Sequence, residues 1–322
     1  MKAMVYREYG SPDVLSLTEM PIPMPADDEV LVRVHASSVN DYDYHLLTGH
    51  PFLNRIGAPF KPRNPVLGSD VAGVVESVGK DVTQFQIGDE VFGDVSPCGF
   101  GAFAEYVCAR ENALALKPPV LTFEQAAAVP QAGGLATVAV YRGRPLRPGR
   151  RVLINGAGGG VGTFAVQIAK AHGCDVTAVD RASKLDVLLS VGADHVIDYL
   201  TQDYSRTGQT YDLMVDIAMH RPLSANRRAL APGGQCSVTG GSIPRVLLVL
   251  AAGPMLSSFR DTTIRLPLWR PNNKEDTAFL TGLIDQGSVM PVVDSVFPLS
   301  DLPEAFRRFA AQAHTGKIVI TV

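Results

Sequence analysis

The sequence has few cysteines and no excess of charge of either sign. Four cysteines occur among 322 residues, none with a partner at the spacing of a Cys-x-x-Cys metal clip: Cys98, Cys108, Cys174 and Cys236. Isolated thiols in a chain of this length suit a reducing compartment better than a disulfide framework. Lysine and arginine number 29 against 32 aspartates and glutamates, a net charge of −3. This balance argues against a nucleic-acid-binding protein.

Long hydrophobic runs are also scarce. The longest covers residues 243–259, contains Arg245, two prolines and a glycine, and is too short to span a bilayer. We interpret it as a buried helix or as a helix at a subunit contact. The first ten residues, MKAMVYREYG, become charged too early for a signal peptide. The sequence therefore predicts a soluble, cytoplasmic protein that has neither a membrane nor a nucleic acid as its partner.

The pattern of apolar residues changes along the chain. Residues 1 to about 120 contain β-branched runs bounded by Gly, Pro and Asp, such as EVLVRVHASSV and DVAGVVESVG, and are predicted to be rich in strands. The segments FEQAAAVP and GGLATVAVYR then predict helices. From Arg151 onward strands and helices alternate, which predicts a parallel sheet covered by helices on both faces. The fold class is therefore α/β.

A buried strand, a glycine-rich turn and a helix follow one another in VLINGAGGGVG. The spacing Ala157-x-Gly159-x-x-Gly162 is a variant of the GxGxxG fingerprint of dinucleotide-binding folds, with alanine in the first place. Gly159 would let the backbone approach a pyrophosphate, and Gly162 would let the helix pack tightly on the strand. The helix begins near Gly160, and its free N–H groups, including that of Val161, would face the phosphates.

The next strand ends in an acid, Asp180, which raises the question of coenzyme choice. A carboxylate at this place usually accepts hydrogen bonds from the ribose hydroxyls of NAD and repels the 2′-phosphate of NADP. Arg181 and Lys184 follow in the same stretch, DRASK, and a guanidinium and an ammonium are what a 2′-phosphate requires. From these residues alone the two coenzymes stay nearly balanced.

Seven segments, in order, resemble one known family: VNDYDYHLLTG, PVLGSDVAGVVESVGKDV, GDEVFGD, GAFAEYV, VLINGAGGGVGTFAVQIAK, GADHVIDY and GKIVITV. With them the chain resembles, over essentially its whole length, the medium-chain dehydrogenase/reductase superfamily, and more closely its zinc-free quinone oxidoreductase and enone reductase branch. The resemblance implies a GroES-like β-barrel domain for the substrate, residues 1–124 and 271–322. It implies a Rossmann domain with a doubly wound parallel sheet over residues 125–270, and a homodimer.

The resemblance also bears on the coenzyme. NADPH-using relatives place a lysine and a tyrosine against the 2′-phosphate, and in this sequence these fall on Lys184 and Tyr199. Asp180 departs from the small residue usual in those relatives. We expect NADP(H) as the preferred coenzyme and NAD(H) as the alternative. Gly240, in a loop after a later strand, and Lys317, just before the last strand, are further expected coenzyme contacts.

Zinc-dependent alcohol dehydrogenases of the same superfamily hold a catalytic zinc through Cys, His and a second Cys or an acid. The first of these positions is Asn40 here, the histidine segment reads Gly68-Ser69-Asp70, and the four-cysteine structural lobe is missing. We therefore expect no metal. Without one, the resemblance implies hydride transfer from NAD(P)H to small electron-poor acceptors, either quinones or the β-carbon of α,β-unsaturated carbonyl compounds.

The catalytic candidates lie in VNDYDYH, which matches the VNxxD pattern that lines the substrate side in the family. Asn40 would hold the substrate oxygen or a nearby loop, and Asp43 would orient its neighbours or take part in a proton relay. Tyr44 would donate a hydrogen bond or a proton to an enolate oxygen. Each of the three is equally well explained as a structural residue of a packed turn.

Two other functions stay open at this point. One is an enoyl thioester reductase, for which Arg55, Lys61 and Arg63 would form a basic approach surface for a phosphate-bearing carrier. The other is a catalytically weak NADPH-binding protein that acts as a sensor or as a partner in a complex.

Overall fold

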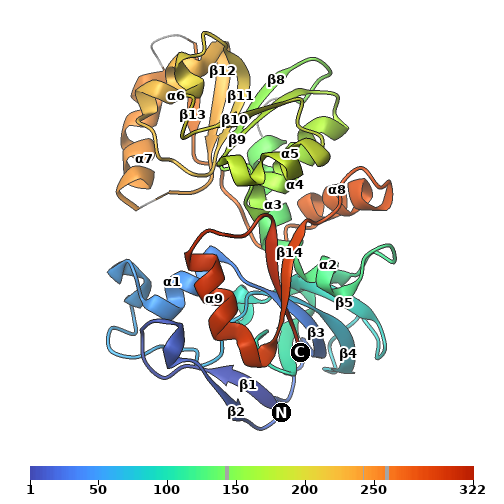
Figure 1. The fold of residues 1–322 in the computed structure, drawn as a ribbon. Helices are drawn as coiled ribbons and strands as arrows, with labels where there is room; N and C mark the ends of the chain where they lie inside the picture. Colours follow the sequence, from blue (N-terminus) through green and yellow to red (C-terminus); the bar gives the residue numbers. More distant parts are fainter. Residues whose placement is uncertain (142–144, 242, 258–260) are drawn as a thin grey trace. The chain divides into compact units, whose positions relative to one another are not determined.

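The computed structural model describes residues 1–141, 145–241, 243–257 and 261–322 (Figure 1). The described residues form two compact units. Unit 1 comprises residues 1–132, 271–278 and 291–322, and unit 2 comprises residues 133–270 and 279–290.

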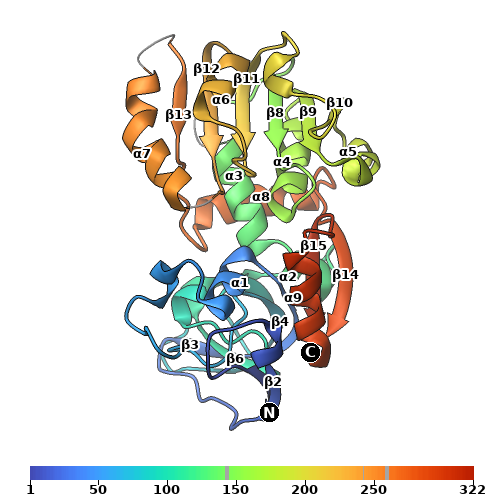
Figure 2. The same ribbon diagram turned by 60° about the vertical axis from the view of Figure 1, so that its left-hand side comes forward.

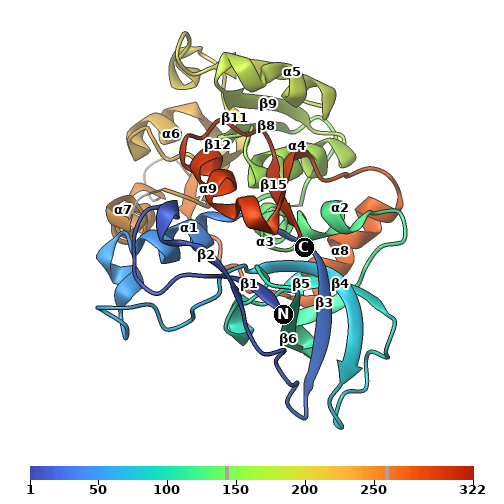
Figure 3. The ribbon, with the colours of Figure 1, turned by 60° about the horizontal axis from the view of Figure 1, so that its bottom comes forward.

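Unit 1 is built around a largely antiparallel sheet. Within the described residues, its strands pair in the order β14-β15-β3-β4-β5-β7, and β6 pairs with the first half of β3. The long strands β3 and β4 lie side by side in Figure 3. The strands of this sheet are β3 (Glu29–Ser38), β4 (Asp70–Val78), β5 (Glu90–Asp94), β6 (Tyr106–Arg110), β7 (Leu114–Leu116), β14 (Val293–Pro298) and β15 (Lys317–Thr321).

Smaller elements complete this unit. Strands β1 (Lys2–Val5) and β2 (Ser16–Glu19) form an antiparallel pair. The helices are α1 (Asp41–Thr48), α2 (Phe123–Ala127) and α9 (Leu302–Ala310), with a 3₁₀ turn, η2 (Phe52–Arg55), after α1. Helices α3 (Pro130–Val140) and α8 (Lys274–Asp285) each begin in unit 1 and end in unit 2.

Two clusters of apolar residues form the core of unit 1. Because side chains alternate along a strand, Val30, Val32 and Val34 of β3 share one face, and they pack in one cluster with Val71 and Val75 of β4. In the other cluster, α9 contributes Phe306, whose ring meets that of Phe103 edge to face at 5.9 Å.

Unit 2 contains the doubly wound parallel sheet that the sequence predicts. Within the described residues, its strands pair in parallel in the order β10-β9-β8-β11-β12-β13, which can be followed across the upper part of Figure 2. The strands are β8 (Arg151–Asn155), β9 (Asp175–Asp180), β10 (His195–Asp198), β11 (Tyr211–Asp216), β12 (Leu230–Val238) and β13 (Thr263–Arg265). The intervening helices are α4 (Gly160–Ala171), α5 (Leu185–Ser190), α6 (Leu223–Ala229) and α7 (Ile243–Ser257).

The direction of winding reverses between β8 and β11. Right-handed crossovers therefore place α4 and α5 on one face of the sheet and α6 and α7 on the other. In such sheets, ligands bind at the carboxyl ends of the strands that flank this reversal. The glycine-rich turn follows β8 at that point.

The longest apolar run of the sequence coincides with α7, while residues 258–259 lie outside the described residues. Leu247, Leu248 and Leu250 of this helix are exposed in the single chain. The run is therefore not fully buried, and a subunit contact at α7 stays a prediction. Among the described residues, no helix is long and apolar enough to cross a membrane.

Candidate active site

Strand β8 leads into the glycine-rich turn, and α4 begins directly after it. The chain turns at Gly156, whose φ of +85° favours glycine, and Gly159 is the residue that precedes the helix. A Cβ atom at Gly162 would lie 2.4 Å from the carbonyl oxygen of Ala157. Only glycine therefore lets α4 pack this closely on the end of β8.

Gly159 occupies a different environment. A Cβ atom there would have the Gly156 carbonyl oxygen as its nearest neighbour, at 3.9 Å, and the φ of Gly159, −85°, is open to any residue. Neither conformation nor packing within the chain requires glycine at this position. The amides of Gly160 and Val161 lie in the first turn of a helix, where amides lack intrahelical acceptors and carry the positive end of the helix dipole. The open space at Gly159 and the positive end of the α4 dipole together suit a diphosphate group.

Asp180, at the end of β9, is bonded to the glycine-rich turn. Its Oδ2 accepts a hydrogen bond from the Gly158 amide at 2.7 Å, and its Oδ1 accepts one from the Arg181 amide at 2.9 Å. A Cβ atom at Gly158 would meet both Asp180 and the Cδ of Lys184, so the aliphatic stem of Lys184 packs over the turn. The amide of Tyr199 donates to the Asp180 carbonyl at 3.2 Å. The structure thus brings these predicted coenzyme residues together around one turn.

The ends of the strands at the winding reversal are joined by buried polar side chains. Asp216, the last residue of β11, accepts hydrogen bonds from the side chains of Asn155 on β8, at 2.8 Å, and of Asn226 on α6, at 2.6 Å. Beyond β12, a Cβ atom at Gly240 would lie 2.2 Å from the Ile217 carbonyl oxygen. The two loops can therefore pack this closely only if residue 240 is glycine. Sequence reasoning missed Asn155 and Asn226, because amides inside apolar strands and helices carry no local signal of their partner.

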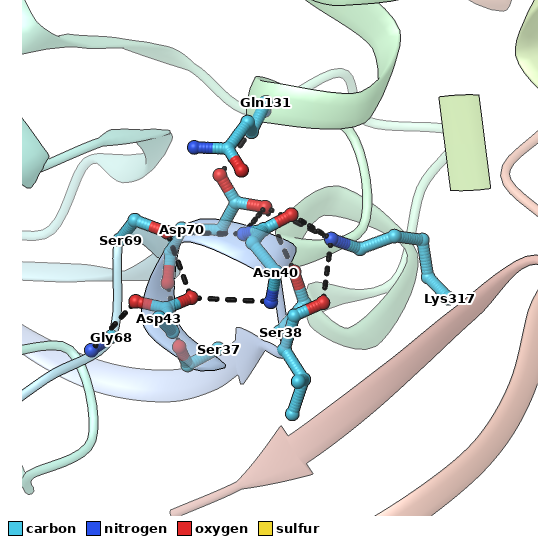
Figure 4. A network of polar contacts seen from close by, with 10 residues as sticks. Ser37, Ser38, Asn40, Asp43, Gly68, Ser69, Asp70, Gln131 and Lys317 are labelled. Atoms are coloured by element: carbon cyan, nitrogen blue, oxygen red, sulfur yellow. Dashed lines mark hydrogen bonds and ion pairs between the residues drawn. The ribbon is translucent and has the colours of Figure 1, made fainter. Parts of the chain in front are cut away.

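Unit 1 contains a second, larger polar network (Figure 4). Asn40 precedes α1, and its Nδ2 donates to Ser69 Oγ at 3.0 Å and to Asp70 Oδ2 at 2.8 Å. Asp43 accepts hydrogen bonds from the Asn40 amide at 3.1 Å, the Ser69 hydroxyl at 3.0 Å and the Gly68 amide at 3.2 Å. The reciprocal pair of Asn40 and Asp43 is a capping box, and it explains why a helix begins here.

Asp70 is the most connected member of the network. Besides the Asn40 amide group, it accepts hydrogen bonds from the Ser38 hydroxyl at 2.8 Å and from the backbone amide of Gln131 at 3.1 Å. Lys317, the first residue of β15, supplies the cation: its Nζ donates to the Val39 carbonyl at 3.1 Å and to the Asn40 side-chain oxygen, and lies 3.4 Å from Asp70 Oδ2. The structure therefore places Lys317 inside unit 1 with its ammonium bound to this network. Its contact with the coenzyme stays a prediction.

Burial alters the ionisation of this network. The pKa of Asp43 is raised to about 7, chiefly by burial and then by the negative charge of Asp70. The same two causes raise the pKa of Asp94, a buried carboxyl at the end of β5, to about 6. Burial lowers the pKa of Lys317, and the neighbouring carboxylates of Asp70 and Asp43 oppose that shift. Asp43 and Asp94 thus keep their protons at pH values where exposed aspartates are ionised.

The positions that hold the metal in zinc-dependent relatives are occupied by members of this network. Asn40, at the first position, donates to Ser69, which stands at the histidine position, and to the neighbouring Asp70. The Lys317 ammonium contacts both Asn40 and Asp70. A divalent cation at this place would be repelled by the ammonium and would find few soft donors. In the described part of the chain, no cluster of His, Cys, Asp and Glu side chains has the geometry of a metal site. The residues present do not fit a catalytic zinc.

The three catalytic candidates lie in two different environments. Asn40 and Asp43 are buried, and their side-chain oxygen and nitrogen atoms are used in hydrogen bonds within the chain. The Tyr44 ring instead packs against Phe306 and Phe309 of α9, with centroid separations of 6.2 and 5.9 Å. The geometry favours a positioning role for Asn40 and Asp43 and a packing role for Tyr44.

A cavity of about 310 Å³ lies beside α1 in unit 1. Aromatic and aliphatic side chains dominate its lining, which consists of Tyr6, Tyr9, Tyr42, Leu46, Leu53, Asn54, Ile56, Gly57, Ala58, Pro62, Arg63, Asn64, Leu67 and Phe100. Tyr42, on α1, lies next to Phe100 with a centroid separation of 5.5 Å. Burial, followed by the charge of Asp43, raises the pKa of the Tyr42 phenol, which therefore stays protonated and able to donate a hydrogen bond.

The raised pKa of Asp43 predicts a pH dependence of stability. Between its ordinary value of 3.8 and about 7, the folded protein holds a proton that the unfolded chain has lost. Protonated Asp43 therefore contributes its full stability below pH 3.8, the pKa of the unfolded chain. This contribution is lost as the pH rises through about 7, the pKa in the folded protein. The Asp43→Asn variant cannot titrate at this position. Relative to it, the free energy of unfolding of wild-type unit 1 should fall by about 1.4 kcal/mol for each pH unit between the two pKa values.

Hydrogen exchange of the β3 and β4 amides, corrected for intrinsic exchange rates, would measure this difference in the free energy of opening. A difference between the two proteins that stays constant from acid to neutral pH would show that Asp43 is ionised in the folded state.

Comparisons with known proteins agree with this architecture. The family model of the alcohol dehydrogenase GroES-like domain matches residues 26–119, and that of zinc-binding dehydrogenases matches residues 191–320. A chloroplastic quinone oxidoreductase of Triphysaria versicolor is 34% identical over 99% of this chain and 98% of its own length. The 2-methylene-furan-3-one reductase of Solanum lycopersicum is 33% identical over 99% of this chain and 79% of its own.

Among solved structures, a mycobacterial protein in complex with NADPH is 25% identical, with a TM-score of 0.82 over 100% of both chains. The sequence relatives match the chain almost from end to end. The chain therefore belongs to the quinone oxidoreductase and enone reductase branch of the NAD(P)H-dependent medium-chain dehydrogenases/reductases.

Proposed function

We propose that this protein transfers a hydride from NADPH to quinones or to the β-carbon of α,β-unsaturated carbonyl compounds, without a metal ion. The observation that carries the proposal is the open space at Gly159 before the first turn of α4, next to the cluster of Asp180, Lys184 and Tyr199. The names of the relatives support both acceptor classes, since one is a quinone oxidoreductase and the other reduces a 2-methylene ketone. When bound, the reduced nicotinamide supplies the hydride.

The residues of unit 2 would bind the coenzyme through its phosphates. The first-turn amides of α4 would hold the diphosphate, and Lys184 and Tyr199 would bind the 2′-phosphate. The Gly158 and Arg181 amides already donate to the Asp180 carboxylate, which lowers its repulsion of a phosphate. This arrangement accounts for an acid at a position where NADPH-using relatives usually have a small residue.

The residues of unit 1 would bind the acceptor. Its cavity offers aromatic and aliphatic side chains for contact with a ring or an alkenyl chain, mixed with polar groups such as Asn54 and Asn64. The Tyr42 phenol would donate a hydrogen bond to the carbonyl oxygen, where negative charge develops after hydride addition. The network of Asn40, Asp70 and Lys317 would keep α1, and with it Tyr42, in place. We accordingly propose residues 1–124 and 271–322 for the acceptor and residues 125–270 for the coenzyme. The homodimer and the cytoplasmic location stay predictions.

Coenzyme oxidation by metal-stripped protein tests this function. NADPH and NADH would be compared with a quinone, a short 2-alkenal, a cyclic enone and a crotonyl thioester as acceptors. Turnover of the quinone or the enones with NADPH and without metal would support the proposal. A preference for the thioester would favour the enoyl thioester reductase, and tight coenzyme binding without turnover of any acceptor would favour a sensor.

The choice of coenzyme can be tested at Lys184. A Lys184→Met change keeps the aliphatic stem that packs over Gly158 but removes the charge. Because a charge-assisted hydrogen bond to the 2′-phosphate would be lost, the Kd for NADPH should rise about 10- to 100-fold while the Kd for NADH stays within a few fold. Calorimetric titration of both coenzymes measures this split. Equal losses for both would show that Lys184 does not touch the 2′-phosphate.

A further inference from the structure

The segment after α1 combines exposed apolar side chains with cations. Phe60 is 92% exposed, Ile56 75%, Phe52 67% and Leu53 52%, all within nine residues. Between Asp43 and Asp70 the chain has no acidic residue, although its net charge is −3, whereas Arg55, Lys61 and Arg63 fall inside this stretch. Exposed apolar side chains and cations that follow one another so closely along a segment are typical of an interaction site.

This segment is held in place by bonds within the chain. The Arg55 guanidinium donates to the Gly49 carbonyl at 3.1 Å and lies 4.5 Å from the centre of the Tyr9 ring. The Tyr9 hydroxyl donates to the Ala58 carbonyl at 2.7 Å, and the Asn54 side chain donates to the carbonyl of His50 at 2.9 Å. The exposed side chains are therefore presented by an ordered loop.

The two sides of the loop have different surroundings. The cavity of unit 1 is lined from this loop by Leu53, Asn54, Ile56, Gly57, Ala58, Pro62 and Arg63. Leu53 and Ile56 therefore border both the cavity and the solvent. Phe52, Phe60 and Lys61 are exposed to solvent. The loop is thus both a wall of the cavity and a projecting apolar and basic surface.

We propose that residues 52–63 dock on the surface of an anionic lipid bilayer. Aromatic and aliphatic side chains would enter the interfacial region, while Lys61 and Arg63 would contact the anionic headgroups, as in other surface-binding segments. None of the described helices could span a membrane, and the sequence predicts no membrane partner, but docking of a loop requires no span. If the proposed function holds, docking also brings the acceptor cavity to the phase in which apolar quinones and alkenals dissolve.

Vesicle sedimentation with the full chain tests the proposal without any need for turnover. Wild-type protein should sediment with phosphatidylcholine vesicles that contain phosphatidylglycerol, much less with pure phosphatidylcholine, and less as salt is raised. Phe52→Ser/Phe60→Ser should weaken binding to the anionic vesicles about tenfold or more, and Lys61→Gln about fivefold at low salt. Met24→Ser is the matched control, because Met24 is 90% exposed in the same unit but outside the loop, and it should bind as wild type.

Four outcomes would overturn the proposal. Wild-type protein could stay in solution with both kinds of vesicle, or all variants could sediment alike. The Phe52→Ser/Phe60→Ser variant could instead change the oligomeric state, measured by sedimentation equilibrium, which would make the loop a contact between copies of the chain. Lys61→Gln could raise the KM for a crotonyl thioester without affecting vesicle binding, which would assign the loop to a soluble phosphate-bearing carrier. Failure to oxidise NADPH would count against the proposed function alone.

Discussion

A Lys317→Met variant should lose about 3–5 kcal/mol of the free energy of unfolding of unit 1 at neutral pH, because removing one partner of a buried ion pair leaves the other charge uncompensated. The Lys317 ammonium is bound to the Val39 carbonyl, to Asn40 and to Asp70, and its side chain is 5% exposed. The nearby carboxyls of Asp70 and Asp43 would face each other without a cation. Protonation of Asp43, whose pKa is raised by burial, relieves the repulsion, so the loss should shrink as pH falls.

Two comparisons separate this effect from a general loss of packing. Lys170→Met removes a partly exposed pair with Asp194 and should cost only about 0–1 kcal/mol. In the double variant Lys317→Met/Asp70→Asn both charges are gone, so the loss should be clearly smaller than the sum of the two single losses. Hydrogen exchange of the β3 and β4 amides reports the values for the unit 1 variants, and exchange of the β8 and β9 amides reports the value for Lys170→Met in unit 2. If both variants lost the same free energy of unfolding, the Lys317 ammonium would not stabilise the polar network of unit 1.

Gly159→Ala should leave the stability of unit 2 unchanged but raise the Kd for the coenzyme about 10- to 100-fold. The backbone at Gly159 has a φ of −85°, and the added methyl group would find no chain atom closer than 3.9 Å. The methyl group would lie where a diphosphate approaches the first turn of α4, and overfilling a close contact typically costs about 1–3 kcal/mol.

Gly162→Ala is the matched variant with the opposite pattern. Helix propensity alone would make alanine more stable than glycine inside α4 by about 1 kcal/mol. The added Cβ would however lie 2.4 Å from the Ala157 carbonyl oxygen, a backbone atom that cannot yield without moving the strand end. We expect the clash to dominate and the unfolding midpoint in urea to fall. If Gly159→Ala bound NADPH as tightly as wild type, no coenzyme phosphate would approach that position.

The features predicted best from the sequence are those that depend on neighbouring residues. The apolar strand β8, the glycine turn and α4 are consecutive, so periodicity and spacing identify them and place Gly162 against β8. The capping box of Asn40 and Asp43 is also local, and it identifies α1 as a helix, where the family pattern alone indicates a packed turn on the substrate side.

The polar network of unit 1 depends on contacts that no local pattern encodes. Lys317 and Asn40 are 277 positions apart, and they meet only because β15 pairs with β3. From the sequence, Lys317 was a charged residue before a strand and was therefore expected at the coenzyme. The exposure of Phe52 and Phe60 is likewise hidden in the sequence, where two aromatic residues are equally compatible with a core.

The position of β15 in the sheet of unit 1 has a consequence for the order of folding during synthesis. This strand lies between β14 and β3 in space, yet it follows every other strand of its sheet in the chain. The ribosome releases residues 133–270, with the six described strands of the parallel sheet, before it releases β15. Until then the edge of β3 that β6 leaves free, at Ala36 to Ser38, stays unpaired, and Asp70 lacks its cation. The nascent amino-terminal strands therefore need protection from aggregation for most of the time that translation takes.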